Sequence, residues 1–204
     1  YTGKIKRKGE EISEFTKKKL RSETSALLYP DEFNPESTVF EEVIRGRIHL
    51  KKMLNPYSEI DRDSTQAIID ETGLSEKSII RLKRSSDSTI RMALIARTIN
   101  SGSDIIILDS PEQGLDPSQK LSVIRALKKY TVKGDKSVLI ASSDIDFLVK
   151  ICDRIIVFKE GEIFETGGCD IITEDLMKKI FGIDAMIVKN IITGLPEIHI
   201  INNE

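Results

Sequence analysis

The residues most able to do chemistry in this chain lie at the end of one apolar run. Residues 105–108 are Ile-Ile-Ile-Leu, and they are followed by Asp109, Ser110, Pro111 and a second acid, Glu112. A buried parallel strand delivers its last side chain to the carboxyl edge of a sheet, where the ligands of open α/β folds bind. Asp109 is therefore placed to meet a magnesium ion directly or through water, and in nucleotide-binding proteins that ion sits on the phosphates.

Composition sets broad limits on the class of protein. A chain of 204 residues can form one sizeable domain with room for a small accessory one. The 31 Lys and Arg residues are balanced by 33 Asp and Glu residues, which gives no general argument for a nucleic acid or an anionic membrane. We therefore expect no nucleic-acid partner.

The cysteines and the apolar runs bear on the compartment. Cys152 and Cys169 show no ligand spacing, which predicts a reducing compartment and no zinc site. No apolar run approaches the roughly 18 residues that a membrane-spanning helix needs, and no signal peptide is visible. Since the first residue is Tyr1 rather than Met, we expect the natural chain to start upstream.

The first hundred residues predict a small β-region followed by helices. Residues 3–12 predict an exposed hairpin, and Ser13 is placed to cap a basic helix over 14–19. A strand is expected over 24–29, ended by Pro30. Four helices should follow: one opened by Thr38 with Glu41 as a capping box, one over 64–72, a short one capped by Ser75, and a buried one over 87–100.

After residue 100 the pattern alternates between strand and helix. The strand that ends at Asp109 precedes a helix begun by Pro117, a favoured first-turn residue. The expected elements that follow are a strand over 137–141, a helix from Asp144, a strand over 154–158, a turn at 160–161 into a strand over 162–165, and a helix capped by Thr173 that reaches Phe181. This alternation predicts an α/β fold with a mostly parallel sheet.

With these residues in hand, the chain resembles the ATP-binding subunits of ABC transporters. Residues 109–116 look like the family's Walker B and D-loop, usually D-E-P-x-x-x-L-D, and residues 91–97 look like the helix after its signature loop. Residues 142–144, Ser-Ser-Asp, occupy the switch position that is T-H-D in the family. Residues 152–167 match the closing hairpin, and the tail over 173–201 is similar to that of ATPases that drive iron-chelate and vitamin B12 import.

The resemblance implies an ABC-type P-loop NTPase core with a mostly parallel sheet and a helical subdomain. It divides the chain into 1–36, a remnant of the N-terminal β-subdomain and Q-loop region; 37–103, the helical subdomain; 104–168, the core; and 169–204, the tail. It implies ATP and Mg²⁺ as cofactors of the family, and the departures described below predict that this chain binds them weakly or not at all. It also implies pairing with another ABC subunit, as a homodimer or heterodimer, and docking of the helical subdomain on a membrane permease or a soluble complex. The location would be cytoplasmic, with a peripheral position at the inner face of the membrane as one option.

Departures from the family pattern bear on catalysis. The sequence has no G-x-x-x-x-G-K-[ST] phosphate loop, which the family places shortly upstream of the hairpin that starts at Gly3. The glutamate that polarises the attacking water is replaced by Ser110, and the switch histidine by Ser143. A hydroxyl cannot act as a carboxylate base near neutral pH, so we assign no catalytic residue. Glu112 is an alternative base only if its loop bends back.

The binding positions are also altered. The resemblance assigns Ser85, Ser86 and Asp116 to nucleotide binding, and Asp109 and Asp31 to the metal. The signature, usually L-S-G-G-Q, is Arg-Ser-Ser-Asp-Ser over 84–88, which puts a carboxylate beside an expected anion. The Q-loop glutamine falls at Pro30 or Asp31. Ser85 can equally be a helix-entry residue, and Asp116 can equally cap the helix begun by Pro117 or contact an opposing subunit.

Together these features predict a degenerate ATP-binding protein with little or no hydrolysis of its own, acting as a nucleotide-sensing or structural subunit. Two alternatives stay open. One is an active ATP-hydrolysing subunit of an iron-chelate or cobalamin importer, and the other is a nucleotide-free scaffold in a soluble complex. The ATPase head of a DNA-repair or chromosome protein is disfavoured, because no heptad pattern is visible.

Overall fold

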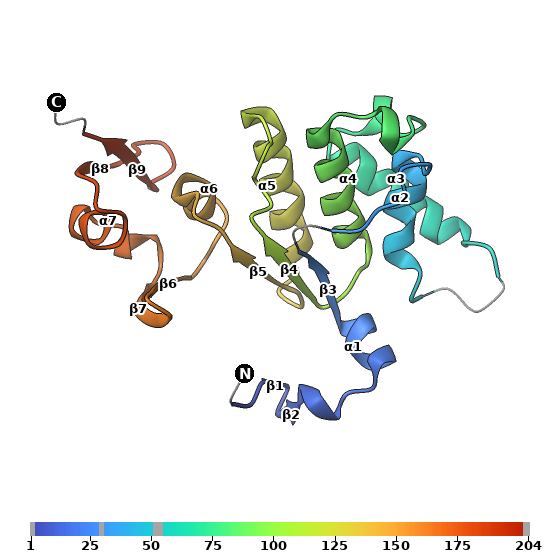
Figure 1. Cartoon of the computed structure of the whole chain (residues 1–204), viewed down its shortest axis with the longest axis horizontal. Helices are drawn as coiled ribbons and strands as arrows, with labels where there is room; N and C mark the ends of the chain where they lie inside the picture. Colours follow the sequence, from blue (N-terminus) through green and yellow to red (C-terminus); the bar gives the residue numbers. More distant parts are fainter. Residues whose placement is uncertain (1–2, 29–30, 51–54, 202–204) are drawn as a thin grey trace. The chain divides into compact units, whose positions relative to one another are not determined.

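The computed structural model describes residues 3–28, 31–50 and 55–201. The chain divides into two compact units, Tyr1–Ala141 and Ser142–Glu204, which Figure 1 draws in blue to yellow and in orange to red respectively.

A three-stranded parallel sheet lies at the centre of the first unit. Its strands are β3 (Thr24–Leu27), β4 (Ile105–Asp109) and β5 (Ser137–Ala141), in the order β3-β4-β5. Leu27 pairs with Leu108, and Asp109 pairs with Ala141. All three strands therefore end at the same edge of the sheet, and the parallel arrangement expected from the sequence is confirmed.

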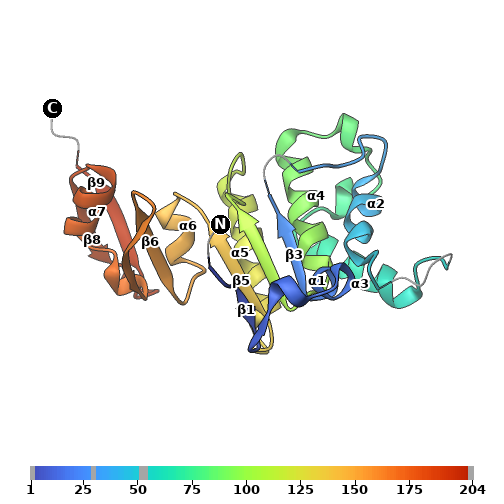
Figure 2. The ribbon, with the colours of Figure 1, turned by 60° about the horizontal axis from the view of Figure 1, so that its bottom comes forward.

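Two long helices pack beside this sheet (Figures 1 and 2). They are α4 (Asp87–Asn100) and α5 (Pro117–Thr131), and both begin at the residues that the sequence predicted. Ten of the 14 residues of α4 are buried, as expected from its apolar composition. Helix α4 contacts strand β3 of the sheet and also the helices that precede it in the chain.

The helical segment consists of α2 (Val39–Ile44), η2 (Arg45–Arg47), α3 (Glu59–Glu71), η3 (Ser75–Lys77) and η4 (Leu82–Arg84). The predicted capping box at the start of α2 is present, with Thr38 and Glu41 exchanging two hydrogen bonds. Two predictions were wrong in detail. The second helix begins at Glu59, because Ser58 and Asp61 form a capping box of their own. Ser75 is the first residue of η3 and does not cap it.

The N-terminal elements differ from the prediction at one point. The hairpin is present as β1 (Lys6–Arg7) and β2 (Glu10–Glu11), followed by η1 (Ile12–Glu14). The basic helix is α1 (Lys17–Glu23), and its cap is Thr16, whose hydroxyl accepts from the amide of Lys19. Ser13 lies inside η1. The predicted strand over 24–29 ends at Leu27, and Pro30 lies outside the described residues.

The second unit has its own small core. Its elements are α6 (Ile145–Val149), β6 (Ile155–Lys159), β7 (Glu162–Gly167), η5 (Cys169–Ile171), α7 (Glu174–Phe181), β8 (Ala185–Lys189) and β9 (Pro196–Ile200). Strands β6 and β7 form one antiparallel hairpin, and β8 and β9 form another. Val149, Ile155, Ile172 and Leu176 make the buried centre.

Candidate functional site

The carboxyl edge of the sheet carries Asp109 as the last residue of β4. The next residue, Ser110, takes a φ of 45°, a left-handed conformation that is uncommon for any residue other than glycine. Its amide donates to the carbonyl oxygen of Ala141 over 2.8 Å, which continues the β4–β5 ladder by one step. Its hydroxyl donates to Oδ1 of Asp109 over 3.3 Å. Pairing with β5 thus fixes the backbone of Ser110 where its hydroxyl can bond the carboxylate of Asp109.

Glu112 lies in the turn that follows. The amide of Gln113 donates to the carbonyl oxygen of Ser110 over 3.1 Å, and the amide of Leu115 donates to that of Glu112 over 3.2 Å. Gly114 supplies a φ of 73°, which a residue without Cβ adopts at little cost. Glu112 itself is only 7% exposed, so the turn folds this residue into the protein.

Asp31, the second predicted metal ligand, pairs with a cation of helix α4. Its Oδ2 accepts from Nη2 of Arg97 over 2.5 Å. The same guanidinium donates through Nη1 to Oε1 of the buried Glu42 over 2.6 Å, and to the carbonyl oxygen of Glu32 over 3.0 Å. Arg97 therefore ties the loop after β3 to α2 and α4. Sequence reasoning missed this contact, and the only available signal was an arginine in an apolar helix.

The signature-like segment uses its hydroxyls within the chain. Ser85 donates to the carbonyl oxygen of Arg81 over 3.2 Å. Ser86 is the N-cap of α4, and its Oγ accepts from the amide of Thr89 over 3.3 Å. Asp87 occupies the first turn of that helix, where a carboxylate is favoured by the helix dipole. Ser85 therefore closes η4, of which it is the C-cap, and Ser86 is the residue that enters α4. Nucleotide binding by Ser85 and Ser86 stays a prediction.

Asp116 caps α5, which is one of the two roles predicted for it. Its Oδ1 accepts from the amide of Gln119 over 2.9 Å, and its own amide donates to Oε1 of Gln119 over 3.0 Å. Nε2 of Gln119 also donates to Oγ of Ser88 over 3.4 Å. The D-loop-like and signature-like segments therefore meet at the starts of α5 and α4. Contact of Asp116 with an opposing subunit stays a prediction.

The switch-like residues lie in the second unit. Ser142 accepts from the amide of Asp144 over 2.9 Å, and Asp144 caps α6 by accepting from the amide of Phe147 over 2.9 Å. Ser143 is exposed between them. The predicted helix start at Asp144 is confirmed, and the Asp of the switch pattern serves as a structural cap.

These residues do not by themselves fit a complete Mg²⁺·ATP site. Within residues 3–28, 31–50 and 55–201, no group of three or more His, Cys, Asp or Glu side chains is arranged to hold a metal ion. Magnesium needs few protein carboxylates when phosphates supply other ligands, so Asp109 alone could meet it only beside a bound polyphosphate. Asp31, the other predicted ligand, is engaged by Arg97.

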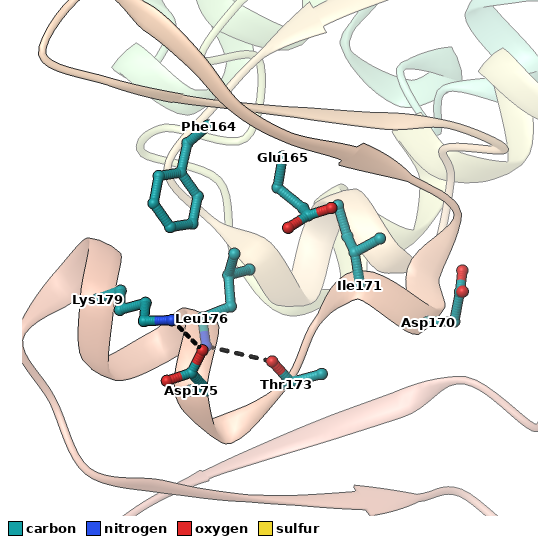
Figure 3. A pocket seen from close by; sticks show the side chains of 8 residues that line it. All are labelled: Phe164, Glu165, Asp170, Ile171, Thr173, Asp175, Leu176 and Lys179. Carbon is teal, nitrogen blue, oxygen red and sulfur yellow. Dashed lines mark hydrogen bonds and ion pairs between the residues drawn. The ribbon is translucent and has the colours of Figure 1, made fainter.

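A cavity of about 280 Å³ lies in the second unit (Figure 3). It is lined by Phe164, Glu165, Asp170, Ile171, Thr173, Asp175, Leu176 and Lys179. Its polar groups already have partners in part, because Asp175 pairs with Lys179 over 2.6 Å and Thr173 caps α7. None of the residues assigned to nucleotide or metal lines it.

Comparison with known proteins decides the family. The chain is 30% identical over 179 residues to the phosphonates import ATP-binding protein PhnC of Mesoplasma florum, an alignment that covers 84% of this chain and 72% of that protein. The chain belongs to the ATP-binding subunits of ABC transporters. It is also 23% identical to the iron(3+)-hydroxamate import ATP-binding protein FhuC of Bacillus subtilis, over 96% of this chain and 73% of FhuC.

Solved structures agree on the ABC cassette fold. The dimeric cassette MJ0796 bound to ADP and phosphate matches with a TM-score of 0.71 and 20% identity, over 82% of this chain and 73% of that one. The cassette MJ1267 in its ADP conformation matches with a TM-score of 0.65 and 19% identity, over 82% and 69%. No family model matches the sequence. Among the described residues, no helix is both long and apolar enough to cross a membrane.

Proposed function

We propose that this ABC subunit senses nucleotide or supports a partner subunit, and that its own site hydrolyses ATP slowly or not at all. The observation that carries the proposal is Ser110, the residue after the acid that ends β4. Its hydroxyl donates to Asp109, and a hydroxyl is not a base near neutral pH. Losing a general base costs on the order of 10²–10⁴ in rate.

The residues at the other family positions offer no replacement for the missing base. Glu112 is buried at 7% exposure, whereas a base must come within hydrogen-bond reach of the attacking water. Asp31 is held by Arg97, and Ser143 has no ring that titrates near neutral pH. The altered signature segment supports the same conclusion, because Ser85 and Ser86 bond within the chain and Asp87 adds negative charge beside them.

The proposed partners follow from the family. PhnC and FhuC are named as import ATP-binding proteins, and MJ0796 is a dimeric cassette. We infer that this chain pairs with another ABC subunit and docks through its helical segment on a permease at the cytoplasmic face of a membrane. When ATP and Mg²⁺ bind, Asp109 is the described residue that would face the ion.

The test of lost catalysis is a comparison of ATP turnover by the full natural chain and by its Asp109→Asn variant, with the exposed Asp135→Asn as matched control. We expect the three rates to agree within error. Wild-type turnover at an ordinary enzymatic rate of about 1 s⁻¹ or more, lost in Asp109→Asn and kept in Asp135→Asn, would overturn the proposal in favour of an active subunit.

A binding titration with Mg²⁺ and ATP separates the two remaining roles. Saturable binding at micromolar nucleotide, weakened by Asp109→Asn and unchanged by Asp135→Asn, would support nucleotide sensing. No binding, either alone or with a partner ABC subunit, would contradict sensing and leave a purely structural role.

A further inference from the structure

Two thiols of the second unit lie at the base of the β6–β7 hairpin. Cys152 precedes β6, and Cys169 is the first residue of η5 after β7. The two are the only cysteines of the chain. Both are partly buried, and both pack against the same buried centre of the unit.

Backbone geometry brings the two residues together. Sγ of Cys169 lies 3.8 Å from the carbonyl oxygen of Cys152 and 3.5 Å from that of Val149. The last residue pair of the hairpin at this end is Ile155 with Gly167. A Cβ placed on Gly168 would lie 3.9 Å from the carbonyl oxygen of Asp153, so the two chains stay adjacent beyond the strands.

From this juxtaposition we propose that Cys152 and Cys169 are a covalent modification site, which forms a reversible intramolecular disulfide with an oxidant of the peroxide class. The reaction balances as two thiols and one hydrogen peroxide giving one disulfide and two waters. One thiolate first attacks the peroxide oxygen to give a sulfenic acid and release one water. The second thiol then displaces the second water as the sulfur–sulfur bond forms.

The environment of Cys152 slows its own reaction with peroxide. Burial, with smaller contributions from Cys169 and Asp153, raises the pKa of the Cys152 thiol to about 11. The thiolate is the reactive form, so Cys152 is a poor first target of peroxide. Cys169 also donates through Sγ to two carbonyl oxygens, which favours its neutral thiol. Whichever sulfur is oxidised first, the other is the resolving thiol. The bond would join residues 17 positions apart and clamp the hairpin base, which restricts the unfolded chain and raises Tm.

The experiment uses the purified full chain treated with hydrogen peroxide or with oxidised glutathione, followed by alkylation of remaining thiols under denaturing conditions. We expect the number of titratable thiols to fall by two, the intact mass to fall by two hydrogen atoms, and a non-reduced digest to contain one peptide pair joined through Cys152 and Cys169. A reductant should restore both thiols and lower Tm again.

The variants Cys152→Ser and Cys169→Ser are the matched controls. Neither should lose two hydrogen atoms. The Cys152→Ser variant should accumulate sulfenic acid or a mixed glutathione disulfide at Cys169, because no resolving thiol remains. Should the wild type instead form disulfide-linked dimers, or be oxidised at each sulfur independently with no cross-linked peptide, the proposal is overturned. Because the wild-type peptide map decides the matter, a variant that fails to fold leaves the test intact.

Discussion

The guanidinium of Arg91 in α4 donates through Nη2 to the carbonyl oxygen of Asp109, the last residue of β4, over 2.8 Å. The same nitrogen reaches the carbonyl oxygen of Ser110 over 2.6 Å. One charged donor therefore fixes the backbone of Asp109, where β4 ends, and of Ser110, which has the left-handed conformation. The geometry of the candidate site depends on a residue that contributes no side-chain atom to its chemistry.

The first prediction concerns this contact. Arg91 is 9% exposed, and hydrogen bonds that involve a charged group contribute about 1.5–3 kcal/mol each. We expect Arg91→Met to lower the free energy of unfolding by about 2–4 kcal/mol, measured by urea denaturation followed by circular dichroism. The matched control is the exposed Arg125→Met, which should change it by less than about 0.5 kcal/mol. Equal effects of the two substitutions would contradict the role given to Arg91.

The sequence predicted the elements whose apolar pattern and end signals agree. Helix α4 and strand β4 have the expected bounds. Each is an apolar run, and a polar residue marks one end: Ser86 caps the start of α4, and Asp109 ends β4. Helix α1 was misplaced because Ser13 and Thr16 are both capable caps, and only packing chooses Thr16. The hairpin of β8 and β9 was not predicted. Strand β8 lacks an alternation of polar and apolar residues, and β9 alternates only over 197–200.

The contacts that define the site were less accessible from sequence. Asp31 and Arg97 are 66 residues apart, and no local pattern pairs them. The capping role of Asp116 was predictable because Pro117 and Gln119 follow at fixed spacing. The burial of Glu112 follows from a turn whose shape depends on Gly114 and on strand pairing with β5. Local chemistry could therefore be predicted, whereas long-range pairing needed the fold.

The second prediction is a dependence of stability on pH. Hydrogen bonds from Arg47 and Ser58 lower the pKa of Asp61 from 3.8 to about 2. A carboxyl group whose folded pKa is depressed stabilises the protein above its unfolded pKa and loses that contribution as pH falls toward the folded one. The stability difference between the wild type and Asp61→Asn should therefore be constant above about pH 5, shrink below pH 4, and be small near pH 2.

The control for this pH dependence is Asp63→Asn on the same helix. Asp63 is exposed. Its substitution should change stability by less than about 0.5 kcal/mol at every pH. A difference for Asp61→Asn that stays unchanged down to pH 2 would rule out the proposed ionic contribution. The measurement is urea denaturation at a series of pH values.

The third prediction concerns the turn between β8 and β9. Oδ1 of Asn190 accepts from the amides of Ile192 and Thr193, each over 2.8 Å. Replacing Asn190 with Ala removes both bonds and should speed hydrogen exchange of these two amides about tenfold, which corresponds to roughly 1.4 kcal/mol of local opening. The exposed Ile191→Ala, next in the chain, is the control and should leave the exchange of Thr193 unchanged.

The last prediction concerns the close approach of the helical segment to α4. A Cβ added to Gly46 in η2 would lie 2.1 Å from the carbonyl oxygen of Arg97, a backbone atom that cannot move without displacing the helix. We expect Gly46→Ala to destabilise the first unit by more than about 3 kcal/mol and to loosen the Arg97 contacts with Asp31 and Glu42. Gly134→Ala is the matched control: its φ is 73° and its Cβ would meet open space, so strain alone should cost about 1–2 kcal/mol. The measurement is urea denaturation. Equal costs of the two substitutions would show that η2 can move away from α4 freely, and the helical segment would then not be held rigidly against α4.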